Sequence, residues 1–270
     1  MKICLGLEYD GAHFSGWQSQ VEARTIQGCL EAALSRVAAH PVKVQGAGRT
    51  DAGVHATRQV VHFETAVARP SRAWVLGTNS NLPADIGVLW ATPIAAQFDA
   101  RFSATARRYR YVISNRMTRA GLWHGKLSWE CRSLAVEPMA AAASYLLGEH
   151  DFSSFRAAGC QSNHAIRTIH RLTVQRVGDL VLVDVEANAF LQHMVRNIVG
   201  VLLEIGRGER PSAWAREVLL ARNRTLAGMT APAAGLYLTG VRYPPEFALD
   251  TWPLELPFDS APSPPARNAD

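Results

Sequence analysis

Asp51 lies in a glycine-rich stretch of the chain. Residues 46–55 read GAGRTDAGVH, with three glycines within eight residues and a cation, Arg49, two positions before the acid. Glycines at this density indicate a backbone that turns tightly or lies close to a ligand. A carboxylate held in such a turn can attack an electrophile or remove a proton, and the arginine favours its ionised form. Acids in glycine-rich turns also occur simply as turn formers, so this stretch alone leaves both interpretations open.

A phosphate-binding loop is the obvious alternative for the same stretch, but the residues that it requires are missing. Gly48 and Gly53 have the GxxxxG separation, yet Val54 and His55 stand where a lysine and a serine or threonine are needed. A dinucleotide-binding fingerprint fails as well, because the third glycine is misplaced and the residues that follow read as a strand. The sequence therefore argues against nucleotide binding here.

A second stretch interleaves arginines with tyrosines. Between residues 101 and 119, Tyr109 and Tyr111 stand among Arg101, Arg107, Arg108, Arg110, Arg116 and Arg119. Such a mixture is typical of RNA-binding surfaces, where arginines contact phosphates and rings stack on bases. Tyr109 could stack on a displaced base and bring its hydroxyl near the reacting carbon. A solvated charged strand edge, with Tyr109 as an ordinary strand aromatic, is the alternative interpretation.

The overall composition permits a polyanionic partner without demanding one. The 270-residue chain has a formal net charge of +5, and its only lysines are Lys2, Lys43 and Lys126. Arginine therefore carries nearly all of the positive charge, and it suits bidentate phosphate contacts and base stacking better than lysine does. The four cysteines form no CxxC pair and the nine histidines show no HExxH spacing, although His55 and His193 adjoin motifs. We therefore expect neither a metal nor another cofactor.

No stretch of the sequence predicts a membrane span or a leader. The most apolar candidate, residues 189–205, is interrupted by Gln192, His193, Arg196, Asn197 and Glu204. A spanning helix needs about 20 largely uninterrupted apolar residues. The first residues read as a strand and reach Glu8 and Asp10 too soon for a signal peptide. A cytoplasmic location without membrane contact is the expectation.

Strand and helix patterns place these residues in two similar halves. In the first half, residues 3–9 alternate as a half-buried strand, Thr25 can cap a helix, and further elements are expected at 42–47, 59–64, after Pro70 and at 86–91. In the second half, strands are expected at 104–113, 167–177, 180–187 and 236–242. Helices are expected from Pro138 to near Gly148, over 191–205 and from Ser212.

This repeated order predicts an α+β fold. Two related ferredoxin-like halves, residues 1–100 and 101–243, would each have an antiparallel or mixed sheet with helices on one face, joined around a central cleft. The first half would supply Asp51, and the second Tyr109 and Arg196. Residues 244–270 contain seven prolines, a density that blocks helices and central strands, so a loosely docked or disordered tail is expected.

Five motifs occur in order along the chain. They are Tyr9-Asp10-Gly11 with Phe14 and Gly16-Trp17-Gln18, GRTDAGVH at 48–55, RFSATARRYRY at 101–111, MVRNIVG at 194–200 and GLYL at 235–238. With these motifs the chain resembles the tRNA pseudouridine synthase A family over residues 1 to about 243. The resemblance implies a cofactor-free homodimeric enzyme that isomerises uridine to pseudouridine at positions 38, 39 and 40 of tRNA, in the anticodon stem-loop.

The resemblance also implies roles for individual residues. Asp51 matches the catalytic nucleophile, Tyr109 the tyrosine that contacts the target base, and Arg196 the arginine that pairs with the aspartate. Arg49 is implied in holding the RNA with its base turned out. Further candidates for substrate binding are Arg107, Arg108 and Arg110. A non-catalytic RNA-binding protein with doubled ferredoxin-like domains is the competing hypothesis, but such a protein gains nothing from a carboxylate among its arginines.

Two positions carry specific expectations. Arg58 stands where the family often has glycine, so it either adds a phosphate contact or is simply exposed, and we expect the second. Arg196 falls in the first turns of the helix expected over 191–205, beside its apolar stripe. A partly desolvated arginine at that edge needs a counter-charge, so we predict that its guanidinium lies within about 4 Å of Asp51.

Overall fold

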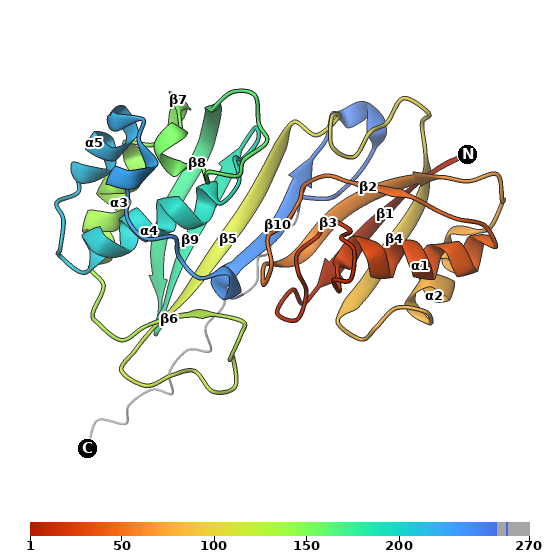
Figure 1. The fold of residues 1–270 in the computed structure, drawn as a ribbon, viewed down its shortest axis with the longest axis horizontal. Helices are drawn as coiled ribbons and strands as arrows, with labels where there is room; N and C mark the ends of the chain where they lie inside the picture. Colours follow the sequence, from red (N-terminus) through yellow and green to blue (C-terminus); the bar gives the residue numbers. More distant parts are fainter. Residues whose placement is uncertain (253–257, 259–270) are drawn as a thin grey trace, which may run out of the picture.

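A ten-stranded sheet runs through the whole molecule. The computed structural model of the chain describes residues 1–252 and Phe258. Its strand order is β4-β1-β3-β10-β5-β9-β8-β7, with β2 paired to β3 and β6 paired to β5 (Figure 1). The strands are β1 Lys2–Tyr9, β2 Val44–Gly46, β3 His55–Glu64, β4 Ile86–Ile94, β5 Ala106–Asn115, β6 Ser128–Glu130, β7 Gly148–Asp151, β8 Ile166–Val177, β9 Leu180–Ala187 and β10 Leu236–Arg242.

Strand β10 joins the two halves of this sheet. It pairs in parallel with β3, where Tyr237 lies opposite His55, and antiparallel with β5, where Leu238 lies opposite Tyr109. Strand β3 directly follows the Asp51 stretch and β5 carries Tyr109, so β10 brings the candidate residues of both halves to the middle of the sheet. The α+β fold predicted from the sequence is confirmed.

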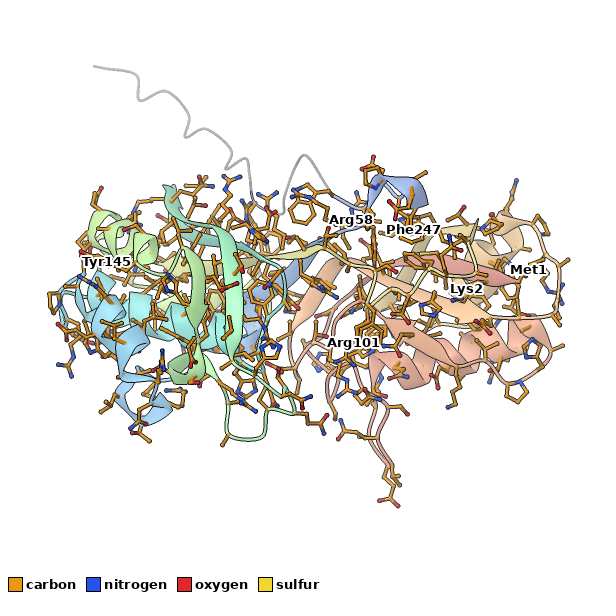
Figure 2. All side chains as sticks on the ribbon, turned by 90° about the horizontal axis from the view of Figure 1, so that it is seen from above. Met1, Lys2, Arg58, Arg101, Tyr145 and Phe247 are labelled. Carbon is orange, nitrogen blue, oxygen red and sulfur yellow. The ribbon has the colours of Figure 1, made fainter. Side chains whose placement is uncertain are left out.

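All five α-helices of the described residues lie on one face of the sheet. Helices α1 and α2 cover the N-terminal half, and α3, α4 and α5 cover the C-terminal half (Figures 1 and 2). They are α1 Ile26–Ala38, α2 Ser71–Asn79, α3 Val136–Ser144, α4 Met194–Gly206 and α5 Trp214–Ala221, with short 3-10 turns η1 Ser153–Phe155, η2 Arg224–Leu226, η3 Ala233–Gly235 and η4 Pro245–Phe247. Within the described residues, none of the helices has the length and apolar character that crossing a membrane requires.

Helix α4 is the most deeply buried of these helices. Only Arg196 and Glu204 in its thirteen residues retain intermediate exposure, so it packs as a core element between the sheet and its neighbours. Gly200 is needed for this packing, because a Cβ there would lie 1.8 Å from the carbonyl oxygen of Met229. The helix therefore has a fixed position from which its first residues can reach the centre of the molecule.

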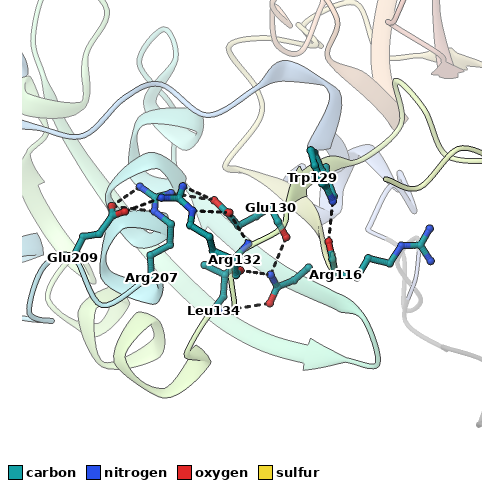
Figure 3. Close-up of polar contacts among 8 residues, drawn as sticks. Arg116, Trp129, Glu130, Arg132, Leu134, Arg207 and Glu209 are labelled. Carbon is teal, nitrogen blue, oxygen red and sulfur yellow. Dashed lines mark hydrogen bonds and ion pairs between the residues drawn. The ribbon is translucent and has the colours of Figure 1, made fainter. Parts of the chain in front are cut away.

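An ion-pair network holds the C-terminal end of α4 (Figure 3). Arg207, just after the helix, contacts Glu130 of β6 at 3.3 Å and Glu209 at 2.8 Å. Arg132 completes the network by contacting Glu130 at 3.0 Å and Glu209 at 2.9 Å. Several of these groups are exposed, so each pair alone contributes little, but together they tie β6 to the end of α4 that lies away from the site.

Element boundaries differ from the sequence expectations where the backbone adopts a left-handed conformation. Thr25 caps α1 as expected, with its hydroxyl accepting from Gly28 N at 3.3 Å. Helix α4, however, begins at Met194 instead of near 191, because His193 has φ 61° and ψ 4°. Helix α3 ends at Ser144 instead of near Gly148, which has φ 91° and opens the unpredicted strand β7.

The first part of the proline-rich tail packs against the N-terminal half. Phe247 contacts Phe98 with 5.0 Å between ring centroids, and Thr251 is 3% exposed. Trp252 lies beneath the guanidinium of Arg242, which is 4.2 Å from the ring centroid. The rest of the tail expected to be loosely ordered lies outside the described residues, apart from Phe258.

Candidate active site

The stretch that carries Asp51 is a tight loop between β2 and β3, here called the Asp51 loop (residues 47–54). Val54 N donates to Asp51 O at 3.1 Å and closes a four-residue turn, whose third residue, Gly53, has φ 79°. A positive φ at that turn position favours glycine, because it has no Cβ to clash. The glycine pattern in the sequence thus has a structural cause that presents Asp51 at the tip of a defined turn.

Glycines of two N-terminal motifs allow the chain to pack directly on the Asp51 loop. A Cβ on Gly11 would lie 1.9 Å from Val54 O, and one on Gly16, where φ is 92°, would lie 2.9 Å from Thr50 O. Trp17 N donates to that same Thr50 oxygen at 3.0 Å. The motifs around residues 9–18 therefore pack directly against the Asp51 loop and support it.

A buried polar network beneath the Asp51 loop, formed by Tyr9, Thr50 and Gln59, holds the loop in place. The hydroxyl groups of Tyr9 and Thr50 share a hydrogen bond of 2.8 Å, and the Gln59 amide donates to Gly48 O at 2.8 Å. Burial raises the pKa of Tyr9 to about 12, so its hydroxyl stays neutral and keeps this bond. Because these groups are buried and hydrogen-bonded, displacing the loop would leave several of them unpaired at substantial cost.

The N-terminal end of α4 reaches Asp51 from the other half of the chain. Arg196 Nη1 donates to Asp51 Oδ2 at 3.2 Å, and Arg196 Nε donates to Ala231 O at 2.8 Å. The two charged side chains are 16% and 25% exposed. The contact predicted from the sequence is present, and the second hydrogen bond fixes the guanidinium between the acid and a backbone carbonyl.

A histidine lies at the same carboxylate oxygen. His193 Nε2 lies 3.4 Å from Asp51 Oδ2, within ion-pair distance. In the sequence His193 only adjoins a motif, and no pattern there predicts this contact. His193 lies three residues before Arg196, a spacing that places two side chains on the same side of a helix. This spacing predicts a shared contact only when the helix is known to begin at Met194.

Tyr109 stands on β5 beside the Asp51 loop. Its ring packs edge-on against Phe190 at 5.0 Å between centroids, and its hydroxyl lies 3.7 Å from where a Cβ on Gly48 would be. Burial raises the pKa of Tyr109 well above its ordinary value. The hydroxyl is therefore protonated at neutral pH, while the ring offers an aromatic wall next to the carboxylate.

These residues line a cleft of about 720 Å³ between the two halves. Its walls come from the Asp51 loop, from Tyr109, from residues 159–162 and from residues 189–196. Small-ligand sites typically have volumes of about 300–1,000 Å³, so a single extruded nucleotide fits the available space. The central cleft predicted from the sequence contains Asp51, Tyr109 and Arg196 together.

The arginines of the site divide into those that face the cleft and those that do not. Arg49 is exposed at the cleft and donates to Gln161 Oε1 at 3.1 Å from the opposite wall. Arg101 is exposed and also lines the cleft. These two guanidinium groups are positioned to contact the phosphates of a polyanion entering the cleft.

Arg107 faces the cleft but uses its guanidinium for the protein itself. It makes five hydrogen bonds, all to backbone carbonyl oxygens, and its acceptors are Ala47, Arg101, Ala104 and Asn188. An arginine side chain has five N–H donors, so none is left for a phosphate while these bonds persist. Arg107 therefore ties the Asp51 loop to β5 and to the connection before α4, which differs from the phosphate contact expected from the sequence.

Arg108 and Arg110 point to the opposite face of the sheet. Arg110 is 1% exposed and forms a bidentate pair with Asp184 of β9 at 2.8 and 2.7 Å. Arg108 lies 5.9 Å from the ring centroid of Trp252. Neither lines the cleft, so this structure does not support the substrate contacts expected of them. Arg58, expected to be simply exposed, is instead half-buried on the same face, away from the cleft, whereas Arg101 lies on the helix-covered side (Figure 2).

The described part of the chain contains no group of three or more histidine, cysteine or carboxylate side chains arranged to hold a metal ion. The chemistry that the site can perform with its own residues is thus that of one carboxylate, two basic side chains and a phenol. A carboxylate in this position can act as a nucleophile or a base.

Several known proteins resemble this chain over most of its length. A family model described as tRNA pseudouridine synthase matches residues 7–103 and 142–244. A protein named tRNA pseudouridine synthase A from Nitrosococcus oceani is 55% identical over 92% of this chain and 96% of its own length. Proteins of the same name from Vibrio cholerae and Coxiella burnetii are 53% and 52% identical, each over 94% of this chain and over 96% and 97% of their own lengths.

One solved structure, described as "Crystal Structure of a Cbf5-Nop10-Gar1 Complex", is similar over 87% of this chain and 57% of that one. The TM-score is 0.33 and the sequence identity is 12%. This likeness is too weak to support an inference.

Proposed function

The chain belongs to the tRNA pseudouridine synthase family and is an isomerase that acts on tRNA, and we propose that it modifies uridines 38, 39 and 40 in the anticodon stem-loop with Asp51 as its nucleophile. The observation that carries the catalytic part is the position of Asp51 in the cleft, paired with Arg196 at 3.2 Å and flanked by Tyr109. The three positions in tRNA rest on the motifs that the chain shares with the tRNA pseudouridine synthase A family.

The reaction requires a bond exchange at one nucleotide. The C1′–N1 bond breaks, the uracil turns, C5 joins C1′ and the C5 proton leaves, without any redox change or group donor. Asp51 can start this sequence by attacking the base or the sugar, or by removing a sugar proton. In each case the carboxylate reacts as the anion and is regenerated at the end, and Arg196 donates to one of its oxygens at 3.2 Å.

The walls of the cleft fit the remaining requirements. A uridine inside a folded RNA must leave its stack before its glycosidic bond is accessible, and aromatic rings can hold the extruded base by stacking. Tyr109 provides such a ring beside the carboxylate. Arg49 and Arg101 at the cleft can hold the phosphates on either side of the extruded nucleotide.

The test uses unmodified tRNA transcripts labelled with tritium at uridine C5. Turnover releases tritium to water as C5 joins C1′, and chemical mapping of pseudouridine then locates the modified positions. We expect release by the native protein, with pseudouridine at positions 38 to 40 in tRNAs that carry uridine there. Release with modification confined to another region of the tRNA would overturn the anticodon stem-loop assignment, while no release would overturn the whole proposal.

We also propose that the enzyme acts as a homodimer in the cytoplasm. The dimer rests on the resemblance to the family, and the location on the sequence, which predicts no membrane span. Light scattering on the purified full-length chain measures the first, with twice the monomer mass expected. Fractionation of the native cells measures the second, and recovery in a membrane pellet would contradict it.

A further inference from the structure

His193 is the one basic side chain at Asp51 that the proposed mechanism does not yet use. Its Nε2 lies 3.4 Å from Asp51 Oδ2, the same oxygen that Arg196 Nη1 contacts at 3.2 Å. His193 and Arg196 both come from the beginning of α4, so one rigid element carries both contacts. Asp51 Oδ1, in contrast, accepts no hydrogen bond from the described residues. The two oxygens of the carboxylate are therefore in different environments.

The backbone of His193 indicates that its position is specifically maintained. The residue has φ 61° and ψ 4°, a left-handed conformation that costs free energy for any residue with a Cβ. Histidine is among the residues that tolerate this region better than most. His193 O accepts from Asn197 N at 2.8 Å, so the strained residue is built into the first turn of α4. Strained residues of this kind are concentrated at functional sites.

We propose that His193 is a positioning residue for the carboxylate. Together with Arg196 it holds Oδ2, which orients the group so that Oδ1 is the oxygen that supplies the electron pair to the substrate. This inference rests on the proposed role of Asp51. Whether Oδ1 attacks C6 or C1′ or takes a sugar proton, the C1′–N1 electron pair passes to the uracil. Once C5 bonds to C1′, the carboxylate is regenerated, either by leaving the carbon that it attacked or by returning the sugar proton. The C5 proton leaves to water and N1 takes up a proton.

A pair of substitutions separates this role from simple packing. His193→Gln keeps a polar nitrogen at a similar reach, whereas His193→Phe keeps a ring but removes the nitrogen that lies near Asp51 Oδ2. Both replacements carry a comparable backbone penalty, because neither residue favours the left-handed region. His124 is exposed and its side chain makes no hydrogen bond or ion pair with the described residues, so His124→Gln and His124→Phe are matched controls.

We expect His193→Phe to lower kcat by about 10- to 100-fold with KM for tRNA within about threefold, because the lost contact orients the reacting group and does not bind RNA. His193→Gln should retain kcat within about fivefold, and the His124 controls should match the native enzyme. Thermal unfolding of each variant shows whether it is folded. Equal losses of kcat for Gln and Phe, or losses confined to KM, would overturn the proposal.

The closing control separates this inference from the proposed function. If Asp51→Asn remains active, Asp51 is not the nucleophile and the proposed function fails. If Asp51→Asn is inactive while His193→Phe has native kcat, only the role of His193 is wrong.

Discussion

Arg196 donates to Asp51 at 3.2 Å, although 145 positions separate the two residues along the chain. One lies on a turn of the N-terminal half and the other on the most buried helix of the C-terminal half. The pair thus connects the two walls of the cleft at the proposed reacting group. Because α4 is anchored at its far end by the Arg207 network, the guanidinium has little freedom to follow a carboxylate that moves.

Removing this arginine should damage both catalysis and folding. We expect Arg196→Ala to lower kcat/KM by about 100-fold or more, since the reacting group loses its orienting charge. The free energy of unfolding should fall by about 1–3 kcal/mol, less than the 3–5 kcal/mol of a fully buried pair, because both side chains are partly exposed. Urea denaturation and single-turnover assays measure the two effects, and native activity in this variant would contradict the role.

Arg196→Lys separates charge from geometry. A lysine keeps the positive charge but cannot hold Asp51 and the Ala231 carbonyl at once with a planar fork. We expect stability close to that of the native protein, with kcat still reduced by about tenfold. If lysine restores full activity, charge alone is sufficient and the fork has no part in catalysis.

Asp51 itself should be essential for chemistry and nearly irrelevant to affinity. We expect Asp51→Asn and Asp51→Ala to abolish tritium release, because one carboxylate performs the bond breaking. The dissociation constant for tRNA should stay within about tenfold, since phosphate contacts from arginines dominate RNA affinity. Filter binding with unmodified tRNA measures the second quantity. Measurable turnover by either variant would remove Asp51 from its proposed role.

Many elements of the fold can be predicted from the sequence, because neighbouring residues determine the backbone conformation of those elements. The Thr25 cap and the glycines of the Asp51 loop each reflect a backbone conformation that a few neighbouring residues determine. The apolar pattern of α4 extends back to Leu191 and therefore predicts a helix that begins there. The helix begins only at Met194, because the left-handed backbone of His193 interrupts it. The residue types around His193 do not predict its left-handed conformation.

In the arginine-rich segment, residues 101–119, the sequence predicts the residue types at the site but not the partners of each arginine. Side chains on a strand alternate between faces, so Tyr109 and Arg107 on the cleft side exclude Arg108 and Arg110 from it. The sequence pattern itself predicts this alternation, so a cluster of arginines along one strand does not by itself indicate a single basic face. The sequence does not predict the partners of Arg107 and Arg110. All acceptors for Arg107 are backbone carbonyls, two of them on the distant residues Ala47 and Asn188, and the partner of Arg110, Asp184, lies on another strand.

The division of the arginines gives a direct test by salt dependence. We expect Arg49→Ala and Arg101→Ala to weaken tRNA binding and each to shallow the plot of log K against log salt by roughly one unit, one for each lost phosphate contact. Arg108→Ala is the matched control, because Arg108 lies on the far face, and its slope should equal that of the native protein. A shallower slope for Arg108→Ala alone would mean that RNA binds the other face of the sheet.

His55, the last residue of the GRTDAGVH motif, supports the other end of the Asp51 loop. Its ring is 2% exposed, accepts from Gly11 N at 3.1 Å and lies with Nε2 3.1 Å from Gly125 O. It also stacks on Tyr237, with ring centroids 4.7 Å apart. The contacts with Gly11 and Gly125 suit a neutral ring with hydrogen on Nε2, whereas Asp10 Oδ1, 3.0 Å from Nδ1, favours the protonated ring. Burial lowers the pKa of His55, and nearby Asp10, which favours the protonated form, offsets this only in part.

This lowered pKa should make the stability of the protein depend on pH just below neutrality. The unfolded chain binds a proton at His55 below pH of about 6.5, whereas the folded chain binds it only at lower pH, so stability falls as pH falls from about 6.5 toward the folded pKa. One such group contributes a slope of at most about 1.4 kcal/mol per pH unit. His62, whose pKa burial also lowers, adds to the slope. We expect His55→Gln to be less stable at pH 7.5 but to lose less stability than the native protein between pH 6.5 and 5.5 in urea denaturation.

His124→Gln, at an exposed site, should keep the native dependence of stability on pH. An unchanged slope in His55→Gln would show that His55 already binds its proton in the folded protein over this range, and that the ring is held through its charge instead of as a neutral group.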